Sequence, residues 1–176
     1  MTSPFNPTYY YRLSNSITGA NLTLSLGNVT SQGSLPSSPQ MGPIQTYSTE
    51  NWQLFHDSGL YFIRSYAYGS SYQLGVNSSN VAVPQMLPTG PGLGMQWNLT
   101  KGLWSTYVFT NMLVGQGNTL DLTTDNKSII MNTDGTGSGW VIDINISAGR
   151  VTNPGMLSTF ASTEVCCLPY SNAFYR

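Results

Sequence analysis

One stretch carries the pattern of the whole chain: Tyr61-Phe-Ile-Arg-Ser-Tyr-Ala-Tyr-Gly69-Ser-Ser-Tyr-Gln-Leu74-Gly-Val76. It opens with Tyr, places Gly eight positions later and closes with two apolar residues at alternating positions. Two further copies of this pattern run over 11–26 and 107–122 without a gap. Downstream of the copies, Met recurs at spacings of 45 and 45 and Trp at spacings of 45 and 43: Met41, Met86, Met131, Trp52, Trp97 and Trp140. This fixed period indicates three copies of one supersecondary unit.

Each copy has the pattern of two short strands joined by a turn. In the middle copy, Tyr61 and Ile63 alternate with their neighbours, as do Leu74 and Val76, and a period of two is typical of half-buried β-strands. A glycine lies between the two runs of every copy, where a turn residue with positive φ is needed: Gly19, Gly69 and Gly115. Because no segment shows a sustained helical period, the sequence predicts an all-β protein.

The number of units selects among all-β folds. Three units of about 45 residues, each with four short strands, are too few for a propeller, which has 4–8 blades. They fit a closed threefold barrel capped by hairpins, the β-trefoil. We place this domain at 9–147, with repeats at about 9–57, 59–102 and 105–147, followed by a C-terminal extension at 148–176. The three repeated Trp residues are then expected in the core and not in a ligand site.

Composition excludes several classes of function. The 176 residues suffice for one domain with a sizeable core. Charged residues make up 7% of the chain, and the net charge is −1. Because no basic cluster exists, binding to nucleic acid or to an anionic membrane surface through counterion release is not expected. No run of 18 uncharged apolar residues occurs, so we expect no membrane insertion.

Two features bear on the compartment. Six Asn-x-Ser/Thr triplets begin at Asn21, Asn28, Asn77, Asn98, Asn126 and Asn145, where chance would give about three. The mild excess favours a secreted glycoprotein, and an Asn-, Ser- and Thr-rich composition explains it equally well. No signal peptide is visible in the first thirty residues. Cys166 and Cys167 are adjacent, and because a vicinal disulfide is strained, we expect free or partner-linked thiols.

The chain resembles a known family at three places. Tyr-Tyr-Arg-Leu-Ser-Asn at 10–15, Thr-Leu-Asp-Leu at 119–122 and one Trp in each unit resemble the ricin B-type β-trefoil lectins, particularly the secreted fungal ones. The resemblance covers about 9–147 and implies a non-enzymatic carbohydrate-binding module whose partner is a glycan or glycoprotein. In that family an Asp at the end of the strand motif accepts hydrogen bonds from vicinal sugar hydroxyls, and a Gln precedes the repeat Trp by two positions.

This chain departs from the family pattern at the Asp position in two units and at the Gln position in all three. The Asp positions hold Ser25, Gly75 and Asp121, and the Gln positions hold Glu50, Met95 and Ser138. We therefore expect at most one sugar site, in the third repeat, with Asp121 as the acceptor and Asn126, Asn132 and Asp134 as rim groups. The same residues also suit an ordinary turn network, since Asp and Asn cap their own backbone in loops. One site per chain favours a homo-oligomer that gains avidity.

Catalytic and metal-binding patterns are sparse. The single histidine, His56, is expected in an exposed turn between the first two units, and no Gly-x-Ser-x-Gly elbow is present. The adjacent cysteines lack the spacing of a zinc site, and 121–126 lacks the Gly and the distal Glu of a calcium loop. We therefore expect neither a metal nor a cofactor.

Two other classes of function stay open. A protein-binding trefoil, such as a protease inhibitor or a secreted interaction factor, is favoured by the long Pro-, Ser- and Gly-rich loop Gly27–Gln40 and by Pro84–Pro91. The third class is an enzyme that acts through a shaped cavity without classical acid/base residues.

Overall fold

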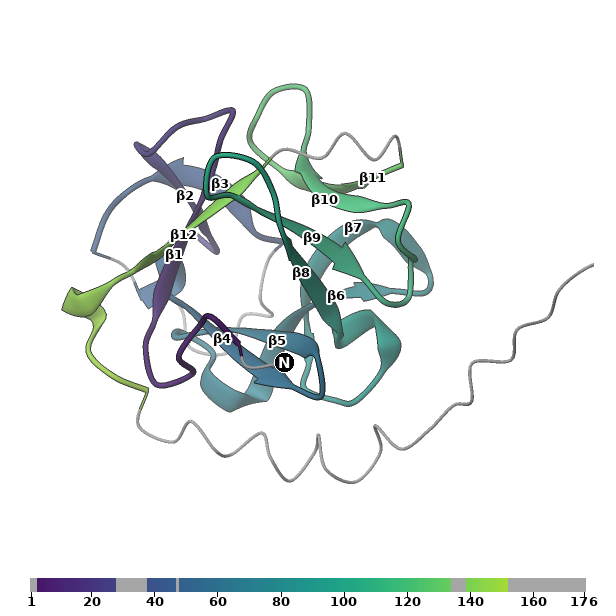
Figure 1. Ribbon diagram of the computed structural model, residues 1–176, viewed down its shortest axis with the longest axis horizontal. Coiled ribbons are helices and arrows are strands. Elements are labelled where there is room, and N and C mark those ends of the chain that lie inside the picture. The colour runs from purple at the N-terminus through teal and green to yellow at the C-terminus, as the bar shows by residue number, and fades with distance from the viewer. Residues whose placement is uncertain (1–2, 28–37, 47, 134–138, 152–176) are drawn as a thin grey trace, which may run out of the picture.

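The computed structural model describes residues 3–27, 38–46, 48–133 and 139–151, which form twelve β-strands and four short 3-10 helices (Figure 1). The strands are β1 (Tyr11–Asn15), β2 (Leu22–Ser25), β3 (Gln40–Pro43), β4 (Trp52–Asp57), β5 (Leu60–Ser65), β6 (Tyr72–Asn77), β7 (Asn80–Pro88), β8 (Trp97–Lys101), β9 (Tyr107–Asn111), β10 (Thr119–Leu122), β11 (Ile129–Asn132) and β12 (Trp140–Ile144). The 3-10 helices are η1 (Ser48–Glu50), η2 (Gly69–Ser71), η3 (Leu93–Met95) and η4 (Ile146–Ala148). Each copy of the repeat thus supplies four strands.

Six strands close into a barrel. Antiparallel neighbours run in the order β9, β12, β1, β4, β5, β8, and β8 pairs with β9 to complete the ring. The other six strands form three hairpins, β2–β3, β6–β7 and β10–β11, which surround the barrel axis in Figure 1. A closed barrel leaves no free sheet edge. The chain is a β-trefoil, as its threefold repeat predicts.

The repeated residues build one threefold core. The Tyr that opens each copy pairs across strands with a repeated Trp: Tyr11 with Trp52, Tyr61 with Trp97, and Tyr107 with Trp140. All three Trp side chains are fully buried, which confirms their predicted place in the core. Their indole N–H groups donate to the carbonyls of Leu24, Leu74 and Leu120 at 2.8, 2.9 and 2.9 Å. Because a buried N–H without an acceptor is costly, these bonds attach each hairpin to the barrel at the same point.

The turn after the first strand of each copy also repeats. Gly19, Gly69 and Gly115 adopt φ of +73°, +53° and +91°, a region that residues with a Cβ rarely enter. Side-chain oxygens of Asn15 and Asn111 accept hydrogen bonds from the backbone N–H two residues on, at 2.9 and 3.0 Å. The glycine period seen in the sequence is therefore a backbone requirement.

A residue outside the repeats fills one end of the barrel. The Phe5 ring makes edge-to-face contacts with Tyr11, Tyr61 and Tyr107, with centroids 5.5, 5.9 and 4.9 Å apart. The Asn6 N–H donates to the Tyr11 hydroxyl at 2.8 Å, and the Ser3 and Tyr61 hydroxyls hydrogen-bond at 3.1 Å, so the N-terminal segment is held on both sides of Phe5. The three tyrosines recur with the repeat and are visible in the sequence as core candidates. Phe5 has no counterpart in the other units, so no periodicity marks it.

The expectation that His56 lies in an exposed turn is wrong. The residue is half-buried within β4, with its ring 4.9 Å from that of Tyr61, because the hairpin turn comes two residues later at Ser58–Gly59. Within Pro84–Pro91, β7 continues to Pro88, which pairs with Tyr72.

Other expectations fall outside the described residues. These are Asp134, Ser138, Cys166, Cys167 and most of Gly27–Gln40. Only the start of the C-terminal extension is described: Arg150 bridges Tyr9, and the Val151 N–H donates to the Thr8 carbonyl at 3.0 Å. Among the residues that the structure describes, no helix is long and apolar enough to cross a membrane.

Candidate functional site

The three hairpins present equivalent positions in one register. Leu24 pairs with Met41, Leu74 with Met86, and Leu120 with Met131. The next pair in each hairpin contains the position at which the lectin resemblance places an Asp: Ser25 with Gln40, Gly75 with Gln85, and Asp121 with Ile130. The three candidate sites can therefore be compared residue by residue.

The first hairpin borders a pocket of about 490 Å³. Its polar wall includes the exposed amides of Gln40 and Gln45 and the carboxylate of Glu50, and its apolar wall includes Met41 and Pro43. A concave surface with apolar walls and a few polar groups is typical of small-ligand sites. This unit keeps no Asp at the motif position, so the family pattern alone does not point to it.

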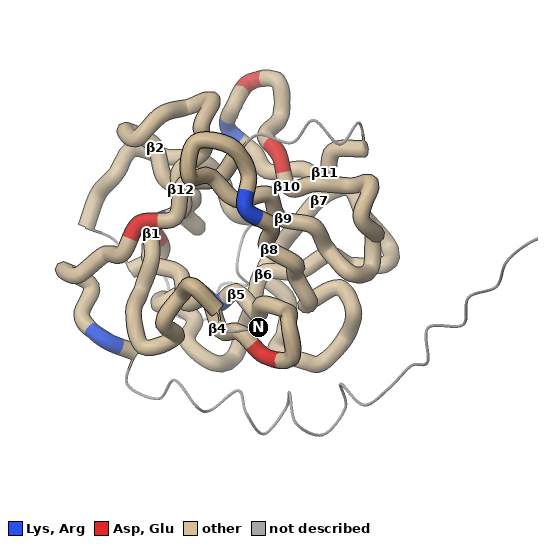
Figure 2. Tube along the Cα trace, viewed as in Figure 1, with Lys and Arg blue, Asp and Glu red and all other residues tan. Residues whose placement is uncertain are grey.

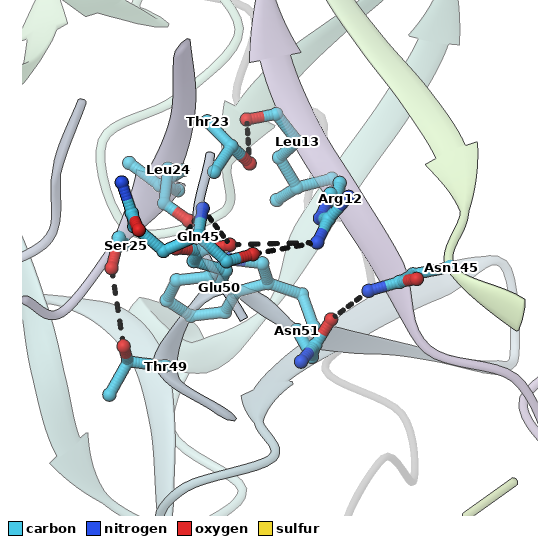
Figure 3. A network of polar contacts seen from close by, with 11 residues as sticks. Arg12, Leu13, Thr23, Leu24, Ser25, Gln45, Thr49, Glu50, Asn51 and Asn145 are labelled. Carbon is cyan, nitrogen blue, oxygen red and sulfur yellow. Dashed lines mark hydrogen bonds and ion pairs between the residues drawn. The ribbon is translucent and has the colours of Figure 1, made fainter. Parts of the chain in front are cut away.

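Glu50 is the charged group of this pocket (Figure 3). Its carboxylate accepts the Gln45 N–H at 2.8 and 3.1 Å, and Arg12 Nη2 lies 3.7 Å from Oε2. Arg12 also donates to the Gln45 carbonyl at 3.0 Å, so the ion pair fixes the peptide groups on both sides of Gln45. Burial raises the pKa of Glu50, and the Gln45 N–H and the charge of Arg12 oppose part of that rise.

The Ser25 hydroxyl is engaged within the protein. It accepts the Gly27 N–H at 3.0 Å and lies 3.3 Å from the Thr49 hydroxyl, which donates to the Gly27 carbonyl at 2.7 Å. Figure 3 shows Ser25 and Thr49 facing one another beside Glu50. Together they hold the chain where it leaves β2, which leaves the exposed amides of Gln40 and Gln45 to meet a ligand beside the buried Glu50.

The second hairpin is closed at the same position. A Cβ on Gly75 would lie 2.7 Å from Met95 Sδ and 2.9 Å from the Gly94 carbonyl oxygen. A Cβ on Gly94 would lie 2.0 Å from the Val76 carbonyl oxygen, so η3 packs directly on β6. Asn111 Nδ2 donates to the Gly94 carbonyl at 2.8 Å and fastens this contact. The space that forms a pocket in the first unit is filled by backbone in the second.

The third hairpin brings together two of the four predicted site residues. Asp121 is 7% exposed, and its carboxylate accepts the Leu122 N–H at 2.8 Å and Asn132 Nδ2 at 3.0 Å. Asn126 is exposed in the following turn with φ of +57°, and Asp134 lies outside the described residues. The sugar site at Asp121, Asn126, Asn132 and Asp134 stays a prediction.

The turn that contains Asn126 contacts the first hairpin. The Met41 N–H donates to the Lys127 carbonyl at 2.7 Å, and Gln40 forms a β-bridge with Ser128. Thr123 and the Lys127 N–H hydrogen-bond to the Asp125 carboxylate, which lowers the pKa of Asp125. This turn, which belongs to the third repeat, therefore lies beside the pocket of the first hairpin.

An exposed apolar tip is a further feature that repeat analysis misses. In the β8–β9 hairpin Leu103 is 79% and Trp104 is 93% exposed, and Trp104 and Ser105 adopt φ of +53° and +62°. Trp104 does not belong to the regular Trp period and follows Gly102 by two positions. This position outside the period is the one sign in the sequence that Trp104 is not a core residue. A pocket of about 370 Å³ beside the tip is lined by Ser16, Thr106, Val108 and Gly139 among others.

Charged groups are scattered over the fold, as Figure 2 shows. Over the described ranges, Arg12 with Glu50 is the one ion pair. Arg64 on β5 is 4% exposed, and burial lowers its pKa to about 10. Within the same ranges no three His, Cys, Asp or Glu side chains lie close enough to hold a metal ion.

Comparison with known proteins rests on structure. No protein-family model and no curated sequence matches this chain. Solved structures do match its fold, among them a mosquitocidal holotoxin with TM-score 0.66 and 19% identity, over 80% of this chain and 18% of the toxin. The designed threefold symmetric protein ThreeFoil matches with TM-score 0.64 and 19% identity, over 76% of this chain and 97% of that one.

A lectin is also among the structural neighbours. The β-trefoil lectin of the Vibrio vulnificus hemolysin/cytolysin, solved with N-acetyl-D-lactosamine bound, has TM-score 0.59 and 13% identity over 80% of this chain and 97% of that one. By contrast, the chain spans 18% of the holotoxin and 32% of an endo-β-galactosidase from Clostridium perfringens. At these identities the likeness establishes the fold: the chain is a β-trefoil whose structural neighbours include a lectin, a toxin and an enzyme.

Proposed function

We propose that the chain is a non-enzymatic carbohydrate-binding module that binds a glycan or glycoprotein in the first-hairpin pocket. The observation that carries this proposal is the pocket of about 490 Å³, which joins two exposed amides and a carboxylate to an apolar wall. The lectin among the structural neighbours supports the ligand class. Kinship with the secreted fungal ricin B-type lectins belongs to the same proposal and rests on the sequence resemblance.

The chemistry of the pocket suits a sugar. Glu50 is 1% exposed, and its carboxylate holds the Gln45 N–H, so it positions the pocket wall while the exposed amides meet the ligand. The amides of Gln40 and Gln45 both donate and accept, as sugar hydroxyls do. Met41 and Pro43 offer apolar surface to the C–H face of a ring. These groups suit binding. Among the described residues that line the pocket, Glu50 is the one carboxylate, so the pair of carboxylates that acid–base catalysis would use is not seen there.

The third hairpin is the other proposed location for the same function. There Asp121 would accept sugar hydroxyls, with Asn126, Asn132 and Asp134 at the rim. We rank it second because the pocket of about 490 Å³ lies at the first hairpin, where the amides of Gln40 and Gln45 are exposed. Both oxygens of the Asp121 carboxylate accept hydrogen bonds from the protein, and a ligand would have to share or displace them.

A glycan array tests the proposal with a matched pair of variants. Gln40 and Gln85 occupy the same register position in the first and second hairpins, opposite Ser25 and Gly75. We expect saturable glycan binding that Gln40→Ala weakens about tenfold, a loss of one good hydrogen bond, while Gln85→Ala leaves it unchanged. Loss in Asp121→Ala alone would move the site to the third hairpin. An array on which all the folded proteins are inert would reject the function.

A second candidate function is binding to a protein partner through the β8–β9 tip. Exposed Trp residues are frequent anchors of protein interfaces, and Leu103 and Trp104 are 79% and 93% exposed. Peptide display on the immobilised protein tests it. Selected peptides should lose binding to Trp104→Ala and keep it with Gln40→Ala, whereas selection of peptides that bind both variants equally would contradict a role for the tip.

A further inference from the structure

A second polar pocket, of about 710 Å³, shares no residue with the first-hairpin pocket. It lies between the β4–β5 hairpin, β8 and the N-terminal segment, and its lining includes Pro4, His56, Asp57, Ser58, Tyr61 and Asn98. We propose that this pocket is a separate site for a neutral saccharide. The proposal takes its ligand class from the proposed function and uses different residues, so the two can fail separately.

The polar groups of this pocket have hydrogen-bonding capacity to spare. The Asp57 carboxylate accepts one bond, from its neighbour Ser58 at 3.4 Å. The His56 ring lies 4.9 Å from the Tyr61 ring at a tilt of 54°, and the structure records no side-chain hydrogen bond for His56 or Asn98 in the described part of the chain. All three side chains are half-buried. A carboxylate, an amide and an imidazole that keep unused hydrogen-bonding capacity and line one concavity are suited to a ligand rich in hydroxyl groups.

The walls of the pocket are held in place before any ligand binds. β4 and β5 pair from Trp52–Ser65 to Asp57–Leu60, and a two-residue turn at Ser58–Gly59, with φ of +50° and +90°, closes the hairpin. On the opposite wall, Ser3 hydrogen-bonds to the Tyr61 hydroxyl at 3.1 Å. A preformed site avoids the entropy cost of ordering loops around a weakly held sugar.

Charge selects the class of saccharide. Asp57 is the one carboxylate among the lining residues, and neither Lys nor Arg is present to balance it. A phosphorylated or acidic sugar would be repelled by this carboxylate. A neutral sugar can donate two hydroxyl hydrogens to it, exchange hydrogen bonds with Asn98, and lay a C–H face against the exposed ring of Pro4.

The test is an NMR titration of the full-length, ¹⁵N-labelled protein made in bacteria, so that the triplet at Asn98 stays unmodified. The probes are methyl β-galactoside, methyl α-mannoside and methyl N-acetyl-β-glucosaminide. We expect one of them to shift the Gly59 and Leu99 amide signals. Asp57→Asn, which keeps the shape of the side chain, should weaken that binding at least tenfold, and Asn98→Ala should weaken it several-fold. Gln40→Ala should leave it unchanged.

The outcomes separate the two proposals. Shifts confined to Gly27 and Gly42, lost in Gln40→Ala and untouched by Asp57→Asn, would overturn this inference and leave the proposed function standing. Binding of galactose 6-phosphate equal to or tighter than that of the galactoside would overturn the preference for neutral sugars. Shifts at neither pocket, with an inert array, would reject both proposals. Thermal melting of each variant checks that the fold is intact.

Discussion

The first and second hairpins pair in the same register, but the first borders an open pocket and the second is filled at the equivalent position. In the first, Ser25 and Gln40 border an open pocket, and a Cβ on the neighbouring Gly42 would meet nothing within 4 Å. In the second, Gly75 is covered by Met95 and Gly94, with no room for a Cβ on either glycine. The contrast shows that threefold repetition fixes the barrel and its core, while departures from repetition at the hairpins decide which unit has space for a ligand.

The largest effect should come from adding a methyl group to the closed hairpin. Gly94→Ala would place Cβ 2.0 Å from the Val76 carbonyl oxygen, a clash with backbone that no rotamer relieves. We expect a loss of about 3 kcal/mol or more in the free energy of unfolding. Gly42→Ala, the control in the open hairpin, should change it by less than about 0.5 kcal/mol. Urea unfolding measures both, and equal effects would contradict the contrast between the hairpins.

Exchanging the two motif residues should give smaller and unequal effects. Gly75→Ser must displace Met95 and the Gly94 carbonyl, so we expect a loss of about 2–3 kcal/mol. Ser25→Gly removes the bonds to Gly27 and Thr49 and should cost about 1–2 kcal/mol. Calorimetric melting of both variants checks the order. A Gly75→Ser protein as stable as the wild type would show that the second hairpin can open.

Substitutions at the motif position of the third hairpin should have an intermediate effect on the free energy of unfolding. Asp121→Ala would leave the Leu122 N–H and Asn132 Nδ2 without their acceptor, and we expect a cost of about 1–2 kcal/mol. Asp121→Asn should lose less, because its amide oxygen can keep one of the two bonds. If both variants unfold like the wild type in urea, the carboxylate is not structural and its candidacy as a sugar acceptor gains weight.

The sequence predicts this fold well because its repeats are requirements of packing. Tyr11, Leu24, Met41 and Trp52 recur because each must fill the same place in a threefold core, and the repeat glycines recur because their turns need positive φ. Phe5 fills that core from outside the repeats, so a search for periodicity cannot find it. His56 was misplaced by two residues because a strand end and a tight turn share the same local composition.

The candidate sites were harder to predict for a different reason. A motif comparison gives weight to Asp121, yet that carboxylate is used by its own hairpin, while the open pocket belongs to a unit that lost the Asp. The second hairpin is closed because η3 approaches β6 closely, through a contact between Gly94 and Val76. These residues are eighteen positions apart in sequence, and no motif marks their contact. The same holds for the pocket at Asp57 and Asn98, which combines three separate segments.

The smallest effect concerns the charge in the open pocket. Burial raises the pKa of Glu50 above its ordinary value of 4.5, so between that raised pKa and about 4.5 the folded state binds more protons than the unfolded state. The Glu50 contribution to stability therefore increases as the pH falls through this window. Glu50→Gln should remove that dependence. Because Arg12 is 27% exposed and lies 3.7 Å from the carboxylate, losing the ion pair should change stability by less than about 1 kcal/mol at pH 7. Unfolding curves from pH 4.5 to 7.5 test it, and parallel profiles of the two proteins would contradict the raised pKa.

The most direct test of the central claim is a crystal structure of the protein with the glycan that the array selects. The account predicts electron density for the sugar in the first-hairpin pocket, within hydrogen-bond distance of Gln40 and Gln45, and none at Gly75. Density at Asp121, with the first-hairpin pocket empty at saturating sugar, would contradict it.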